Sequence, residues 1–310
     1  MNKPLPLILL SLLISISPLH AQKGKSSRPT QQSSQPLSGL YLTIDAGLLI
    51  PNDKQANFYS GRPETPNNLL RVLKSEQYGT QIWSDLVDRQ LISPSAIHDY
   101  GEFTIAEYAN MYYRLTFQIG VGFRYVYDNG WGWLARFDFS EVTASGLFQL
   151  SSNNGTGILG SNNYVKCGIY GRERRVLIDF GISKRIPLTQ MIDLEFDLGF
   201  DVNNTKVEKN GIRVPDSKGK TYSILDVWGG QTPYTGIGTY EYVNQGGVGI
   251  GGFGTVALSY KVPVGAIDFG YTYYYMQTKF LGYNEDDCYA PQHNIFFRFN
   301  LNNFSFFDKK

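Results

Sequence analysis

Apolar and polar residues alternate with a period of two along much of this chain. The pattern is clearest from Met191 to Asn203, where large apolar side chains fill every second position and carboxylates fill most of the positions between them. Neighbouring side chains point to opposite faces of a β-strand, so this segment predicts a strand with one apolar and one acidic face. A tilted strand needs about 9–11 residues to cross a bilayer, and this segment is long enough.

Seven further segments show the same alternation, which gives eight predicted strands. They are residues 40–50, 113–127, 131–142, 174–186, 191–203, 247–262, 266–281 and 293–302. Long and short connections alternate between them: the long loops are 51–110, 143–171 and 204–246, the short turns are 128–130, 187–189 and 263–265, and a shorter fourth loop, 282–292, precedes the last strand. An even number of strands with short turns at one end and long loops at the other is typical of transmembrane β-barrels.

Two of the connections carry local structure. At Asp128-Asn129-Gly130, the apolar positions on either side of the turn have the same parity, which predicts a three-residue turn with Gly130 in the left-handed conformation. In the first long loop, residues 67–91 contain short stretches of helical spacing.

The sizes of the side chains decide which face points inward. An eight-stranded barrel has an interior only just wide enough for its side chains, and the large residues of the apolar face would not fit there. The polar face is rich in glycine, serine and threonine, which suit the crowded side. We therefore predict an all-β fold, an eight-stranded antiparallel transmembrane β-barrel with long extracellular loops and short periplasmic turns. The expected interfacial aromatic residues are Tyr113, Tyr125, Trp131, Trp133, Tyr271, Tyr273 and Tyr275.

The eight strands, the asymmetric loops and aromatic-rich stretches such as Ile267–Tyr275 resemble the bacterial outer-membrane barrels of the OmpX type and the OmpA transmembrane domain. The resemblance implies a porin-like or OmpA-like barrel in the bacterial outer membrane. It departs at the end of the chain. Such barrels usually end in a phenylalanine, whereas here the Phe-rich stretch 304–307 is followed by Asp308-Lys309-Lys310.

The ends of the chain and its charge complete the predicted organisation. Residues 1–21 have the basic start, short apolar run and small final residue of a secretory signal peptide. We predict that residues 22–37 form a flexible periplasmic leader. Residues 38–303 are expected to form the barrel, and residues 304–310 a C-terminal tail. Without the signal peptide, the chain has 27 basic and 27 acidic side chains. That balance gives no indication of nucleic-acid binding.

The polar face carries charges of both signs in nearly equal numbers. Buried charges are costly unless they are paired, so we predict a ladder of ion pairs that plugs the lumen. The candidate residues of this lumen charge network are Arg114, Arg124, Arg136, Arg175, Asp138, Asp179, Asp193, Glu195, Asp197, Asp201, Asp268 and Arg298. An alternative use of the carboxylates at 193–201 is a cation path or metal site. Nearby arginines would compete for them, so we predict neither a metal nor a cofactor.

Two cysteines and two histidines of the exported chain are the remaining candidates for chemistry. Cys167 and Cys288 fall in predicted outer loops, where they would either form a disulfide or remain separate thiols. His98 has Ser95 and Asp99 nearby but no recognisable catalytic signature, and His293 begins the last predicted strand. We therefore expect the protein not to be an enzyme.

A plugged barrel with long loops predicts a structural or interaction platform of the cell envelope. Its expected partners are outer-membrane lipid and lipopolysaccharide, together with a surface or envelope-complex protein that contacts loops 51–110, 143–171 and 204–246. A small pore is the alternative function, and a lipid A-modifying enzyme is the lesser one. Channel conductance would distinguish the pore, and activity on lipid A the enzyme.

Overall fold

The computed structural model describes residues 38–65, 67–75, 78–88, 103–152, 164–215, 220–224, 245–283 and 288–302. The chain divides into two units, Met1–Ser33 and Ser34–Lys310, and every described residue belongs to the second. The predicted signal peptide, leader and C-terminal tail, and His98, lie outside the described residues.

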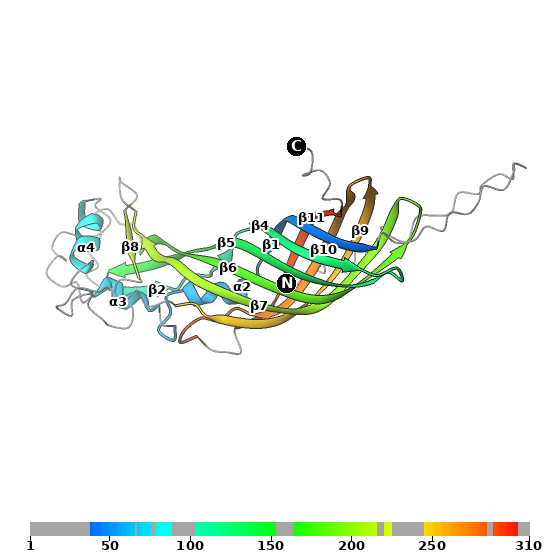
Figure 1. Ribbon diagram of the computed structural model, residues 1–310. Helices are drawn as coiled ribbons and strands as arrows, with labels where there is room; N and C mark the ends of the chain where they lie inside the picture. Colours follow the sequence, from blue (N-terminus) through cyan, green and yellow to red (C-terminus); the bar gives the residue numbers. More distant parts are fainter. Residues whose placement is uncertain are drawn as a thin grey trace, which may run out of the picture. The chain divides into compact units, whose positions relative to one another are not determined.

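Within the described chain, eight antiparallel strands close into a ring (Figure 1). In ring order they are β1 (Gly39–Ile50), β4 (Thr116–Val126), β5 (Trp131–Ser152), β6 (Tyr164–Pro187), β7 (Ile192–Arg213), β9 (Val248–Val262), β10 (Gly265–Gln277) and β11 (Tyr289–Leu301). Pairing of β1 with β11 closes the ring, with Asp45 opposite Arg298. The predicted eight-stranded barrel is confirmed.

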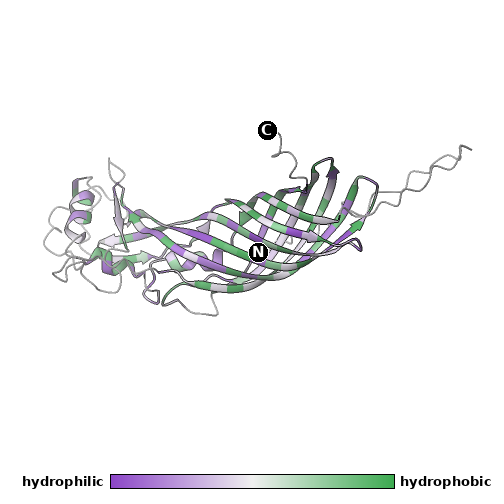
Figure 2. Cartoon of the chain, in the orientation of Figure 1, coloured by the Kyte–Doolittle hydropathy of each residue, from purple (hydrophilic) through white to green (hydrophobic). Residues whose placement is uncertain are grey.

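The two faces of the wall differ as the side-chain sizes predict. Outward residues such as Phe117, Leu198 and Phe297 are 61%, 64% and 56% exposed, whereas the inward Asp179 and Glu195 are fully buried. Figure 2 shows the resulting alternation of hydropathy along the strands. A closed barrel satisfies every backbone hydrogen bond of its wall, so an apolar exterior of this kind suits lipid. No helix in the described parts of the chain is long and apolar enough to cross a membrane.

The first short turn has the predicted geometry. The Tyr127 N–H donates to the carbonyl oxygen of Trp131 at 2.7 Å, so residues 128–130 form the turn. Gly130 has φ = 78°, the left-handed conformation that glycine adopts without strain. The last short turn is tighter than predicted, because Val262 pairs directly with Gly265 and only Pro263 and Val264 lie between them.

Two of the predicted loops are wrong in their bounds, because β5, β6 and β7 continue about ten residues beyond the predicted ends. Residues 143–152 and 164–171 pair as one antiparallel ladder, and 204–213 continue β7. On β5 the apolar positions are odd at Phe137 and Phe139 but even at Val142 and Ala144. The backbone alternation does not change there; the apolar side moves from the outside of the barrel to the inside.

The inward-facing side chains of these extensions form a hydrophobic core. This core lies beyond the end of the membrane-facing part of the barrel. Short elements between β1 and β4 contribute to it: α2 (Asp53–Ala56), η1 (Asn57–Tyr59), α3 (Leu69–Leu73), α4 (Gly79–Asp88), β2 (Phe103–Glu107) and β3 (Tyr112–Tyr113), with β8 (Thr221–Ser223) alongside β7. Phe58, Leu73 and Trp83 are buried in one cluster with Phe148 and Ile212 of the strands. We call these elements and strand extensions the cap. The predicted helical stretches of 67–91 correspond to α3 and α4.

Candidate functional site in the barrel lumen

Two arginines, on the strands that flank β1, share the carboxylates of β7 on the opposite side of the ring. Arg124 of β4 contacts Glu195, and its Nη2 lies 2.8 Å from Asp197. Arg298 of β11 reaches the same two carboxylates at 3.1 and 3.5 Å, and its Nε donates to Asp45 at 2.5 Å. All five side chains are under 10% exposed. Ion pairs therefore cross the barrel and fill its cross-section.

Further pairs extend the network toward the short turns. Arg185 donates from Nε to Glu195 at 2.8 Å, so three arginines converge on this one carboxylate. Lys261 of β9 lies 2.8 Å from Asp193. Asp193, Glu195 and Asp197, at alternate positions of β7, thus pair with cations from β4, β6, β9 and β11, and these ion pairs occupy the carboxylates that a row of bound cations would need.

A third group joins β5, β6 and β10. Arg136 lies 2.8 Å from Asp138 through Nε and also contacts Asp179. The hydroxyl of Tyr274 accepts from Arg136 Nη2 at 2.7 Å and donates to Asp179 at 3.1 Å. A neutral phenol therefore completes this ion pair inside the barrel.

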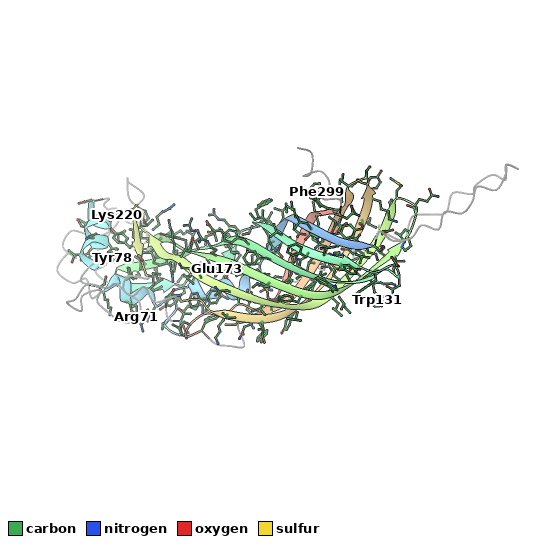
Figure 3. The ribbon with its side chains drawn as sticks, in the orientation of Figure 1. Arg71, Tyr78, Trp131, Glu173, Lys220 and Phe299 are labelled. Atoms are coloured by element: carbon green, nitrogen blue, oxygen red, sulfur yellow. The ribbon has the colours of Figure 1, made fainter. Side chains whose placement is uncertain are left out.

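The last group connects the lumen to the cap. Arg175 donates from Nε to Glu173 at 2.9 Å, and the other carboxylate oxygen of Glu173 accepts from the Tyr59 hydroxyl at 2.8 Å. Glu173 lies between Trp131 at the short-turn end and Tyr78 in the cap (Figure 3). Burial and the neighbouring Glu173 carboxylate raise the pKa of Tyr59 well above its usual value, which keeps the phenol protonated as a donor.

A second route into the cap runs through amide side chains. Arg175 donates to Gln292 at 2.8 Å, and Gln292 donates to Gln55 of α2 at 3.2 Å. Gln55 in turn donates to the carbonyl oxygen of Cys288 at 2.6 Å. All three linking side chains are buried, so α2 is held in the barrel mouth by specific hydrogen bonds as well as by apolar packing.

The structure corrects one predicted member of the network and adds others. Arg114 is exposed, because β3 and β4 are separated by two residues and Tyr113 points inward instead. The prediction of an outward Tyr113 in the aromatic belt is therefore wrong as well. Glu173, Tyr59 and Gln55 were missed. Tyr59 and Gln55 lie in the predicted loop 51–110, and the alternation of β6 was followed only from Arg174 onward, one residue after Glu173. The same odd-numbered alternation continues through 165–173 and would have placed Glu173 inside.

The remaining predicted residues are buried but less strongly paired. Asp268 accepts from Asn300 at 2.7 Å, with Arg298 3.8 Å away. Asp201 accepts from Asn203 at 3.1 Å and has no ion pair with any described residue. Neutral amides are thus the hydrogen-bond donors to these two carboxylates.

Cys167 and Cys288 are both buried, and they form no disulfide with each other. Cys167 lies in the cap part of β6, where burial raises the pKa of its thiol to about 12. His293 lies on the outward face of β11 and shares a 2.6 Å hydrogen bond with the Tyr271 hydroxyl. It is therefore a wall residue and does not point into the lumen.

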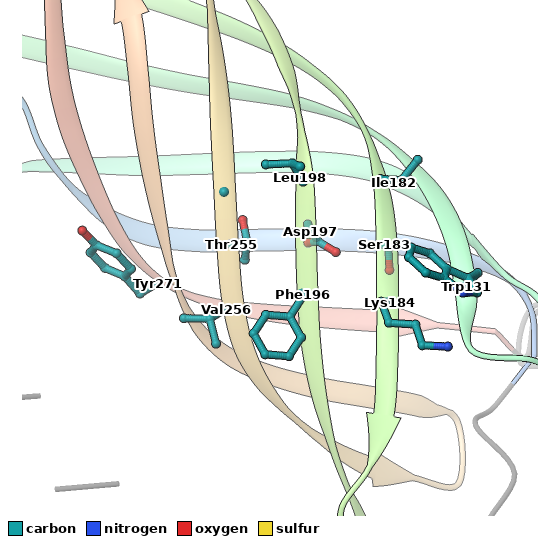
Figure 4. A pocket seen from close by; sticks show the side chains of 11 residues that line it. Trp131, Ile182, Ser183, Lys184, Phe196, Asp197, Leu198, Thr255, Val256 and Tyr271 are labelled. Carbon is teal, nitrogen blue, oxygen red and sulfur yellow. The ribbon is translucent and has the colours of Figure 1, made fainter. Parts of the chain in front are cut away.

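Two of the hollows among the described residues bear on whether the lumen is open. The one among Arg124, Arg136 and Arg298 has a volume of about 10 Å³, room for about one water molecule. The other, about 500 Å³, lies mainly among outward side chains of five neighbouring strands, including Lys184, Phe196 and Tyr271 (Figure 4). The larger hollow is therefore a groove of the lipid-facing surface, not an entrance to a channel.

The fold and the site together define the class of protein: an eight-stranded transmembrane β-barrel whose lumen is filled by ion pairs. No protein-family model matches the sequence, and a search of curated proteins finds no match. Among solved structures, Neisserial surface protein A is similar with a TM-score of 0.36 at 10% identity, over 86% of this chain and 98% of that one. Ail, the attachment invasion locus protein of Yersinia pestis, is similar in complex with the heparin analogue sucrose octasulfate (TM-score 0.31, 10% identity, 85% of this chain and 100% of that one). Similarity at this level carries no information about activity.

Proposed function

We propose that this protein is a non-conducting barrel of the bacterial outer membrane that serves as a structural or interaction platform through its cap. The observation that carries the proposal is the closed interior: arginine-carboxylate pairs fill the lumen, and the hydrogen bonds of α2 continue that network into the barrel mouth. A lumen closed in this way leaves the outer surface as the working part of the molecule.

The outward face of the cap supports an interaction role. Leu147 is 65% exposed and Tyr164 is 54% exposed, and both lie on strand extensions beyond the apolar belt. Contiguous exposed apolar surface is a common feature of protein interfaces, and these two positions are where such a surface on the cap is tested. The predicted contact loops 143–171 and 204–246 are thus partly rigid strand, which would present a partner with a preformed surface.

Photo-crosslinking in intact cells tests the platform. A photoreactive amino acid replaces Leu147 or Tyr164 in the cap, with Phe117 on the lipid-facing wall as the matched control because its exposure is similar. We expect protein adducts of one reproducible mass at the cap positions and only lipid adducts at Phe117. Lipid adducts or none at both cap positions would contradict the platform.

A further inference from the structure

A cluster of charged side chains lies on the outward face of β5, β6 and β7, directly beyond the apolar belt. The last belt row contains Phe139 and Val176, which pair across β5 and β6. The next two outward rows across β5, β6 and β7 carry charged side chains. We call these charged residues, together with the neighbouring Glu208, the basic cluster. It consists of Glu141, Arg172, Arg174, Lys206, Glu208 and Lys209. The cluster therefore begins at the level where lipid tails give way to headgroups.

Like charges face each other across the strand pair. Arg174 pairs directly with Lys206, and Arg172 with Lys209. Like charges in directly opposite positions destabilise a sheet. Lys206 and Lys209 are exposed, and neither forms an ion pair with any residue that the structure describes. Four cations against two carboxylates leave the cluster with a net charge of +2.

The glutamates hold the two arginines in place. Arg172 lies 3.0 Å from Glu141, and Arg174 lies 2.8 Å from Glu208. Glu208 occupies a bulge in β7, so it reaches Arg172 as well, at 3.5 Å. The Arg174 guanidinium also lies over the Phe139 ring, 5.5 Å from its centroid. The arginine side chains are 34% and 45% exposed, so their remaining donors face outward.

We propose that the basic cluster binds the headgroup of an outer-leaflet lipid that carries two phosphates. Guanidinium groups bind phosphate with paired hydrogen bonds, and the two lysines add point charges on one side. The repulsion between opposite cations is relieved when a dianion lies between them. The proposal rests on the proposed function, places the cap on the outer side of the membrane as the sequence predicts for the long loops, and adds a defined lipid site.

Binding is measured with the full chain refolded in detergent micelles in the presence of EDTA, with bisphosphoryl lipid A as the probe. The test variant is Lys206→Gln/Lys209→Gln. The control, Lys166→Gln/Lys184→Gln, removes the same charge from β6 at positions above and below the cluster. Each basic residue near an anionic membrane surface contributes about 1 kcal/mol, or about a fivefold change in affinity, so the test variant should lose about twenty-five-fold. Equal affinity of test and control variants would overturn the proposal.

Two further arms separate a lipid site from a general phosphate site and from a structural ion-pair cluster. Monophosphoryl lipid A should bind more weakly than the bisphosphoryl form, and inorganic pyrophosphate should compete only at much higher concentration. Pyrophosphate binding as tight as lipid A would overturn a lipid headgroup site. The Glu208→Gln variant keeps an oxygen that can accept from Arg174 but raises the net charge of the cluster by one, so it should bind lipid A more tightly; weaker binding would contradict the proposal. Channel conductance tests the closed lumen separately, so the two ideas fail independently.

Discussion

At the scale of single residues, Glu173 joins the lumen to the cap. It neutralises Arg175, which is 1% exposed, and accepts from Tyr59. Removing one partner of a buried ion pair costs about 3–5 kcal/mol, because the other charge stays buried without compensation. We expect Glu173→Gln to lower the free energy of unfolding in guanidinium by that amount.

The matched control for this prediction is Glu141→Gln, because Glu141 is 42% exposed and its ion pair with Arg172 faces solvent. Exposed pairs contribute about 0–1 kcal/mol. Equal destabilisation by the two variants would show that Glu173 is not a junction residue.

Cys167 makes the stability of the protein depend on pH. Burial raises the pKa of its thiol from 9.0 to about 12, so the thiol keeps its proton to higher pH in the folded protein than in the unfolded chain. The stability that results is fully present below about pH 9 and is lost as the pH rises from about 9 to about 12. We expect the unfolding free energy to fall more steeply over this range in the wild type than in Cys167→Ala. The same slope for both proteins would refute this effect.

At the level of the turns, Gly265 is the position least able to accept a side chain. Its φ is +147°, and a Cβ there would lie 1.8 Å from the carbonyl oxygen of Asn300. Backbone strain of this kind costs about 1–3 kcal/mol, and the clash adds to it. Gly265→Ala should therefore lower the midpoint of urea unfolding. The control is Gly254→Ala on the outer wall of β9, where a Cβ meets no atom within 4 Å and the midpoint should stay nearly the same.

The strands were predictable wherever one face met lipid and the other met the lumen. The period of two placed β1 within one residue of its observed start, because apolar and polar positions stay on fixed sides there. On β5 the sequence interpretation stopped at Val142, where the apolar side moves from outside to inside. A search for alternation of either parity would have followed β5 onward, but only the fold shows why the parity changes: beyond the membrane, the barrel interior becomes an apolar core.

For the molecule as a whole, the side-chain sizes were enough to predict which face is inside and that the lumen is charged. They could not show which charges pair, because partners such as Arg124 and Asp197 lie 73 positions apart in sequence and meet only across the closed barrel. The near balance expected from the sequence is also wrong. Among the described residues, six cations and nine carboxylates point inward, and neutral donors such as Tyr274 and Asn300 partner the excess.

The closed lumen is tested most directly by planar-bilayer conductance of the refolded, heat-modifiable protein, with the Asp197→Ala variant measured alongside. The wild type should show no resolved openings, because Arg124 and Arg298 are tied to Asp197 and Glu195 across the barrel. Steady openings of the wild type, with an ion selectivity that changes in Asp197→Ala, would contradict the closed lumen and make the β7 carboxylates the lining of a pore.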